Sequence, residues 1–223
     1  MLRPVLLVGV GGSGGKTLRA MRQSLLRKLR QAGWDRDQLP DGWQMMWVDS
    51  VSQQDEDKFP AQLLPNTQYV GLVTPGLAYS DLRTALEQSV QPQERQAAFA
   101  GWVPESVPIA VSAGAGQARA IGRTISAAQL APLKRALDTA NERLSGVDVI
   151  SDLARVSALF GQSDDTPLTT PMAIVISSVA GGSGSGMFLD VVETLKTVNP
   201  EFAAPDGIIT VLYTPDVFAS IEG

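Results

Sequence analysis

Apolar residues along this chain follow two patterns, short continuous runs and segments in which they recur every three or four positions. A short apolar run bounded by glycine, proline or polar residues is typical of a strand that is buried on both faces. Five such runs predict strands over residues 5–8, 43–48, 107–111, 173–179 and 207–213.

The second pattern predicts helices. Leucine and methionine recur at helical spacing over residues 18–29, with basic residues between them, and Gly33 follows as a stop signal. Further helices are predicted over residues 81–90, 118–144 and 187–197. The basic residues of the first helix are interpreted as its solvated face; they are Arg19, Arg22, Arg27, Lys28 and Arg30.

Strands that alternate with helices predict an α/β fold, in which a mostly parallel, doubly wound sheet lies between two layers of helices. The chain has 223 residues, enough for one such domain, so we expect residues 1–223 to form a single domain. Residues 50–106 show no clear pattern, because five prolines divide them into short pieces.

Composition narrows the possible chemistry. The chain contains neither cysteine nor histidine, which excludes disulfides, thiolate nucleophiles and catalytic triads that need histidine. A net charge of −5 gives no indication of a nucleic-acid partner. No apolar segment approaches the ~18 residues of a membrane span, and no signal peptide is apparent, so we expect a cytoplasmic protein.

Three predicted strand-to-helix turns are rich in glycine: residues 9–15 (GVGGSGG), 113–116 (AGAG) and 181–186 (GGSGSG). The carboxyl ends of parallel strands meet at one edge of a sheet, so the three turns should lie together. Helix N-termini offer unpaired N–H groups, and glycine lets the backbone approach an anion closely. The three turns therefore predict binding of a polyphosphate ligand.

Single motifs within these turns leave other ligands open. Residues 9–14 match the dinucleotide fingerprint G-x-G-x-x-G, but Asp49 lies beyond the usual offset of about 20 residues. Residues 15–17 (GKT) match the end of a P-loop, whose first glycine is replaced by Val10. A nucleophile elbow, G-x-S-x-G, fails because Ser185 stands where its last glycine belongs. Each of these motifs explains one loop or none.

The glycine-rich segments resemble those of the tubulin/FtsZ superfamily of GTPases in order and spacing. Residues 9–16 (GVGGSGGK) are similar to the FtsZ loop GVGGGGGN, and residues 180–186 (AGGSGSG) are similar to the signature GGGTGSG. Residues 114–123 (GAGQARAIGR) are similar to GAGANPEVGR. The resemblance covers essentially the whole chain. The segment between Asp49 and Val107 has no recognisable counterpart in FtsZ, which indicates a divergent bacterial tubulin-like branch.

This resemblance implies GTP or GDP, with Mg²⁺, as the ligand. The first loop would hold the α- and β-phosphates, and the signature loop would surround the phosphates with N–H groups and with the hydroxyls of Ser183 and Ser185. Residues 115–117 would sense the γ-phosphate, Asp49 would lie near the metal, and Asp216 or Glu222 would reach the ribose. The expected nucleotide-binding residues are Gly11, Gly12, Ser13, Gly14, Gly15, Lys16, Asp49, Gly114, Ala115, Gly116, Gln117, Gly182, Ser183, Gly184, Ser185, Gly186, Asp216 and Glu222.

The resemblance also implies self-association into filaments, in which a neighbouring subunit completes the hydrolytic site. The family's base-recognising asparagine and its acidic catalytic loop would follow Gly223, so we expect residues 1–223 to be part of a longer protein and to be inactive alone. Lys16 replaces the asparagine of FtsZ and could contact a phosphate. A Gly184→Val substitution is expected to abolish nucleotide binding while leaving the fold largely intact.

Two alternatives remain at this point. One is an NAD(P)- or FAD-binding Rossmann domain of an oxidoreductase. The other is a tubulin-like scaffold that binds nucleotide without turnover.

Overall fold

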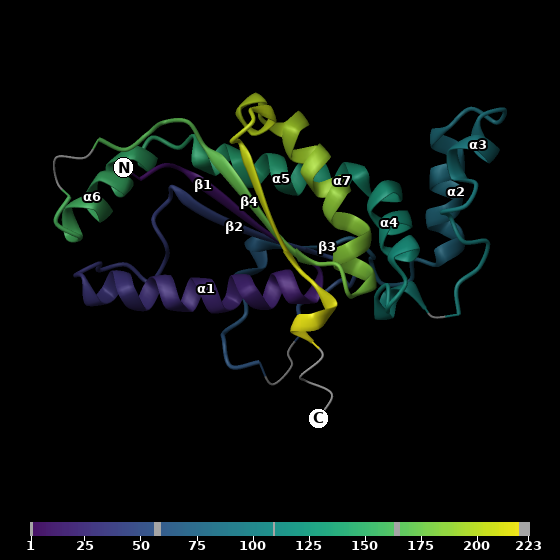
Figure 1. The fold of residues 1–223 in the computed structure, drawn as a ribbon, viewed down its shortest axis with the longest axis horizontal. Helices are drawn as coiled ribbons and strands as arrows, with labels where there is room; N and C mark the ends of the chain where they lie inside the picture. The colour runs from purple at the N-terminus through teal and green to yellow at the C-terminus, as the bar shows by residue number, and fades with distance from the viewer. Residues whose placement is uncertain (1, 56–58, 109, 163–165, 219–223) are drawn as a thin grey trace.

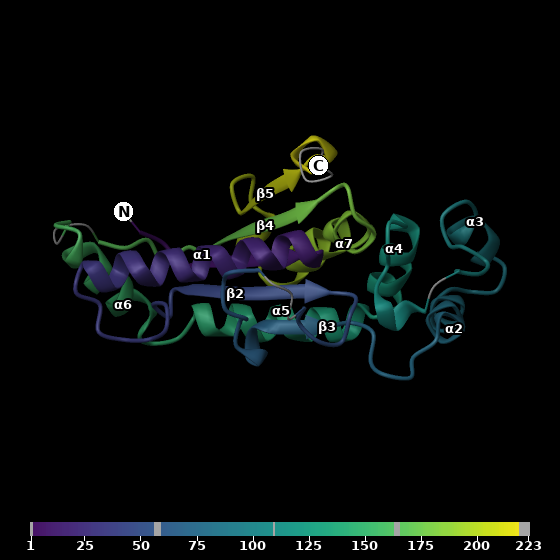
Figure 2. The same cartoon turned by 90° about the horizontal axis from the view of Figure 1, so that it is seen from below.

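The computed structural model describes residues 2–55, 59–108, 110–162 and 166–218. Five parallel strands form one sheet in the order β3-β2-β1-β4-β5 (Figures 1 and 2). The strands are β1 (Val5–Val10), β2 (Trp43–Asp49), β3 (Tyr69–Gly71), β4 (Met172–Ser178) and β5 (Ile208–Tyr213). The expected doubly wound parallel sheet is confirmed, and four of the five predicted strands are present.

Helices cover both faces of this sheet (Figure 1). Leucines of α1 form a buried cluster with Trp47 of β2 on one face, while α5 and α7 pack against the other face. The α-helices are α1 (Gly11–Gln31), α2 (Tyr79–Ser89), α3 (Arg95–Phe99), α4 (Arg119–Ala128), α5 (Leu130–Leu144), α6 (Val149–Leu159) and α7 (Gly182–Val198). Short 3-10 helices are η1 (Asn66–Gln68), η2 (Val111–Ala113), η3 (Pro200–Ala203) and η4 (Pro215–Val217).

Helices α2 and α3 project beyond the carboxyl edge of the sheet, next to α4 (Figure 2). The Tyr79 hydroxyl of α2 donates a 2.6 Å hydrogen bond to the carbonyl oxygen of Pro104. The guanidinium of Arg123 in α4 lies 4.8 Å from the ring centre of Trp102, a cation–π contact. Part of the irregular segment 50–106 is therefore a small helical projection attached to α4.

The strand predicted over residues 107–111 is wrong. Its described residues do not pair in the sheet, and the third strand is β3, which pairs with β2. Val111 instead begins η2 and is buried in the core. Pro108 has no amide hydrogen, so the segment lacks a donor that an interior strand needs.

The single helix predicted over residues 118–144 is also wrong, because α4 and α5 are separate. Gln129 lies between them with a non-helical backbone (φ −109°, ψ 30°). Pro132, in the first turn of α5, would clash with the carbonyl group of Ala128 if the two helices were continuous. Apolar periodicity continues through this break, so the pattern alone did not reveal it.

Arg19 of α1 does not belong to a solvated face, contrary to the sequence-based expectation. Its side chain is buried, and its Nε atom donates a 3.0 Å hydrogen bond to the carbonyl oxygen of Ala61. Its guanidinium also lies 5.1 Å from the ring centre of Phe59. Arg19 therefore attaches the segment after β2 to α1, whereas Arg27, Lys28 and Arg30 are exposed as expected.

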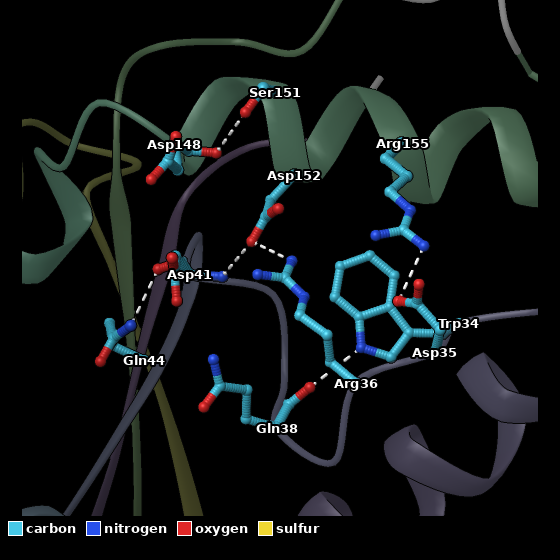
Figure 3. A network of polar contacts seen from close by, with 10 residues as sticks. All are labelled: Trp34, Asp35, Arg36, Gln38, Asp41, Gln44, Asp148, Ser151, Asp152 and Arg155. Carbon is cyan, nitrogen blue, oxygen red and sulfur yellow. Dashed lines mark hydrogen bonds and ion pairs between the residues drawn. The ribbon is translucent and has the colours of Figure 1, made fainter.

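Helix α6, which the sequence pattern did not predict, lies near the amino end of β1 (Figure 1). Asp152 of α6 accepts a 3.0 Å hydrogen bond from the amide of Asp41 and forms an ion pair with Arg36 (Figure 3). The guanidinium groups of Arg36 and Arg155 lie 4.3 Å and 4.9 Å from the Trp34 ring centre. This polar network holds α6 against the connection between α1 and β2.

Candidate functional site

The glycine-rich loops lie together at the carboxyl edge of the sheet (Figure 1). Strands β1 and β4 are neighbours at the centre of the sheet, and they lead into α1 and α7 respectively. The third loop, residues 114–118, leads from η2 into α4. In doubly wound sheets ligands bind outside the carboxyl ends of such central strands, where the direction of winding reverses.

The three loops are joined by direct backbone contacts. The amide of Gly182 donates a 2.8 Å hydrogen bond to the carbonyl oxygen of Gly116. A Cβ atom on Gly11 would lie 2.6 Å from the backbone nitrogen of Gly184. Gly11 and Gly116 have φ angles of +70° and +55°, which favour glycine. The loops therefore form one interlocked unit, with no room for Cβ atoms where they meet.

Most of the predicted binding glycines are required by this packing. A Cβ on Gly14, Gly15 or Gly186 would collide with the Ile176 carbonyl, the Trp47 ring and the Arg119 carbonyl, respectively. Two glycines differ from these, the second residue of α1 and the first glycine of the signature loop. A Cβ on Gly12 or Gly181 would meet no heavy atom within 4 Å. Only these two glycines of the first and signature loops leave space open to a ligand.

The first turns of α1, α4 and α7 have no side-chain caps. Their N-cap residues are Val10, Ala118 and Gly181, and none of them accepts a side-chain hydrogen bond from the helix. None of the three first turns contains an acidic residue. The amide of Gly182, the first of α7, already donates to Gly116. The other uncapped first-turn N–H groups carry partial positive charge and favour an anionic partner.

A pocket of about 470 Å³ lies against these loops. It is lined by residues of the first loop, the α4 loop, the signature loop and the segment after β5, namely Ser13, Gln117, Ser178, Ala180, Gly181, Pro215 and Phe218. None of the seven is charged, so an anion would not meet a carboxylate of the lining. The pocket brings together four chain segments that are far apart in the sequence.

The hydroxyl groups expected to contact phosphate already have partners. Ser185 donates to the carbonyl oxygen of Gly181, within its own helix. The Ser183 Oγ lies 2.7 Å from the Ser50 Oγ, and the latter donates a 3.3 Å hydrogen bond to Asp49 Oδ1. A chain of hydrogen bonds thus connects the signature loop with the end of β2.

Asp49 is buried at the end of β2, and its Oδ1 also accepts a 2.7 Å hydrogen bond from the amide of Ser50. Burial raises the pKa of Asp49 above its usual value of 3.8, and the hydrogen bonds from Ser50 oppose this shift. Burial, with the nearby charge of Asp49 as a smaller cause, also raises the pKa of Tyr69. Asp49 is therefore close to the loops but is shielded from water.

The other predicted residues are placed as follows. Ala115 is fully buried in the core, so its side chain points away from the pocket. Gly114 adopts a φ of +105° next to Ser50 and Val51, and Lys16 is half-buried in the first two turns of α1. Asp216 is exposed, accepts a 3.4 Å hydrogen bond from Thr214 and does not line the pocket. Glu222 lies outside the described residues.

Five of the lining residues were not among those expected from the sequence: Ser178, Ala180, Gly181, Pro215 and Phe218. Ser178 and Ala180 lie next to the signature loop in the sequence, and this proximity could have indicated that they line the pocket. Nothing in the sequence indicates that Phe218 returns to the first loop, because this depends on how β5 pairs with β4.

A protein-family model described as "tubulin like" matches residues 6–223. The chain belongs to this tubulin-like family. A comparison with curated proteins finds no match. A parallel five-stranded sheet flanked by helices is consistent with a tubulin-like domain.

Membrane-spanning helices and clusters of metal-binding side chains are both absent from the described part of this tubulin-like domain. In the described ranges, no helix is both long and apolar enough to cross a membrane. The same ranges contain no group of three or more histidine, cysteine or acidic side chains that could hold a metal ion.

Proposed function

We propose that this tubulin-like domain binds a nucleoside triphosphate, GTP by its family resemblance, at the interlocked glycine loops. The observation that carries the proposal is the meeting of three uncapped helix N-termini beside a pocket without acidic residues. Such N-termini bind phosphates through backbone N–H groups and through the helix dipole. A pocket of about 470 Å³ is also within the usual range for a small-molecule site.

In this proposal the phosphates lie over the first turns of α1 and α7. Gly12 and Gly181 have open space where a side chain would otherwise stand, so the ligand can approach the backbone there. Ser13 and Gln117 supply polar groups from two further positions of the lining. Pro215 and Phe218 provide an apolar wall that suits the nucleoside part of the ligand.

Magnesium, which the family implies, does not fit Asp49 as this structure places it. The carboxylate is only 6% exposed and accepts hydrogen bonds from Ser50, whereas Mg²⁺ usually keeps several of its waters when a carboxylate binds it. Asp49 is therefore not proposed as a metal ligand.

A dinucleotide ligand is less consistent with the position of Asp49. In dinucleotide-binding domains an acidic residue near the end of the second strand binds the ribose hydroxyls. Here the carboxylate at that position is only 6% exposed and accepts hydrogen bonds from Ser50. The Ser50 hydroxyl also contacts Ser183 of the signature loop, so the acidic group is directed toward the protein.

The proposal includes self-association and a shared hydrolytic site. The family resemblance supports filaments in which one subunit holds GTP and the next positions the attacking water. The absence of acidic residues among the seven that line the pocket is consistent with a catalytic group that comes from outside it.

Calorimetric titration of the protein with GTP, ATP and NAD in the presence of Mg²⁺ tests the proposal. We expect saturable binding of a triphosphate and no detectable binding of NAD. Binding of NAD without binding of either triphosphate would overturn it. A preference for GTP over ATP would support the guanine specificity that the family implies.

A further inference from the structure

Arg119 is a positively charged residue beside the pocket that no sequence motif assigned to the site. It is the first residue of α4, and its carbonyl oxygen packs against Gly186 of α7. Its exposed side chain extends toward the end of β4, where Nη2 donates a 3.4 Å hydrogen bond to the carbonyl oxygen of Val179. Val179 lies between Ser178 and Ala180, which both line the pocket.

The contacts of Arg119 leave most of its hydrogen-bonding capacity available. A guanidinium has five N–H donors, and the contact with Val179 uses one of them at a long distance. No carboxylate within the described ranges forms an ion pair with Arg119. By comparison, Arg123, one turn further along α4, already packs over the Trp102 ring.

The pocket itself has no positive charge to balance a polyphosphate. All seven lining residues are uncharged, so the lining offers helix dipoles and neutral donors only. A triphosphate carries one more charged group than a diphosphate, and this group needs a charged or strongly polar partner. Arginine suits that role, because its planar guanidinium can form two parallel hydrogen bonds with phosphate oxygens.

We propose that Arg119 binds the terminal phosphate of a nucleoside triphosphate and distinguishes the triphosphate from the diphosphate. This inference rests on the proposed nucleotide binding and assigns the recognition of its last phosphate. On binding, the guanidinium exchanges its long contact with a neutral carbonyl for charge-assisted hydrogen bonds to the phosphate. Arg119 is a specificity-determining residue in this arrangement, with no role in bond breaking.

Three variants test the inference in the full chain: Arg119→Ala, Arg119→Lys and Arg135→Ala. Arg135 is an exposed arginine of α5 that does not line the pocket, so Arg135→Ala controls for the loss of one positive charge. Affinities for GTPγS and GDP are measured with Mg²⁺, and circular dichroism with thermal unfolding verifies the fold. Competition by tripolyphosphate and by pyrophosphate repeats the comparison without a base.

We expect Arg119→Ala to weaken GTPγS binding by about tenfold or more, as for the loss of a charged hydrogen bond, and to change GDP binding by less than about twofold. Arg119→Lys should keep part of the GTPγS affinity, and Arg135→Ala should behave as the wild type. Unchanged GTPγS affinity in Arg119→Ala, or an equal loss for GTPγS and GDP, would overturn the inference alone. Failure of the wild type to bind either nucleotide would overturn the proposed function as well.

Discussion

The amide of Gly182 donates a 2.8 Å hydrogen bond to the carbonyl oxygen of Gly116, which joins the loop before α7 to the loop before α4. A Cβ atom on Gly182 would lie 2.5 Å from that same oxygen. Glycine is therefore required at residue 182 by the packing of the loops, with or without a ligand. A substitution at a glycine whose Cβ position is blocked by neighbouring atoms should lower the stability of the fold. A substitution at a glycine with open space beside it should instead lower the affinity for a ligand.

Gly184→Val should destabilise the fold, which corrects the expectation from sequence that it would not. A Cβ atom on Gly184 would lie 2.7 Å from the Ser177 hydroxyl and 3.1 Å from the carbonyl oxygens of Ser178 and Val10. Overpacking of this kind typically costs about 1–3 kcal/mol. Urea unfolding of the variant should show the loss directly, and stability equal to that of the wild type would mean that the loops can separate.

Gly181→Val introduces the same side chain three residues earlier, but it should lower nucleotide affinity and leave the fold largely intact. A Cβ atom there meets nothing within 4 Å, and the extended backbone (φ −94°, ψ 172°) is suitable for valine. Because Gly181 is the N-cap of α7, where valine is less favourable than glycine, we expect the free energy of unfolding to fall by about 1 kcal/mol at most. Nucleotide affinity should fall, because Gly181 lines the pocket. Full affinity in this variant, measured by titration, would place the ligand elsewhere.

The sequence predicts the elements of the fold that arise from a local pattern of residues, and it misses those that depend on contacts between distant segments. Strands β1, β2, β4 and β5 follow from continuous apolar runs, and the glycine loops from composition. The separation of α4 from α5 and the three-residue strand β3 depend on tertiary contacts that leave little trace in periodicity. In each of these cases a local pattern was compatible with more than one structure.

The residues of the candidate site could also be predicted only in part. The sequence predicts that three glycine loops meet, but a glycine looks identical whether it has open space beside it, as Gly181 does, or another backbone, as Gly11 does. Ala115 stands between two glycines in a loop and is nevertheless a core residue. Phe218 and Arg119 reach the site only through strand pairing and helix packing, which the sequence does not specify locally.

Asp152→Ala should lower stability and leave nucleotide binding unchanged. The Asp152 carboxylate accepts the hydrogen bond of Asp41 and pairs with Arg36, and the Asp152 side chain is only 11% exposed (Figure 3). The loss of a buried charged acceptor costs about 1–3 kcal/mol. Since this network lies at the amino end of the sheet, the loops at the carboxyl end should not respond. Unfolding and titration of the same sample measure the two effects, and weaker binding by a fully folded variant would contradict their independence.

The stability of the protein should depend on pH through Asp49. Burial raises the pKa of Asp49 in the folded state, so the native state holds this proton more tightly than the unfolded state does. The resulting stabilisation is fully present below the unfolded-state pKa of about 3.9 and is lost as the pH rises through the folded-state pKa. Asp49→Asn removes this dependence.

We therefore expect the stability of Asp49→Asn relative to the wild type to improve as the pH rises from about 4 to 8. Urea unfolding at several pH values measures this, with Asp206→Asn, at an exposed position, as the control. The half-buried Asp190, whose pKa is also raised by burial, is present in both proteins and cancels in the comparison. A constant difference between Asp49→Asn and the wild type across this range would show that Asp49 does not titrate differently on folding.

The last prediction concerns turnover by residues 1–223. Phosphoryl transfer to water needs a group that holds the attacking water in line with the terminal phosphate. None of the seven residues that line the pocket is acidic, and the nearby Asp49 is buried and engaged by Ser50. A bound GTP should therefore hydrolyse very slowly on this chain, even when titration shows that the site is saturated. Phosphate release at several protein concentrations measures the rate per molecule. Steady turnover with a rate per molecule independent of concentration would show that the catalytic groups lie within this sequence, and a rate that rises with concentration would show that a second copy supplies them.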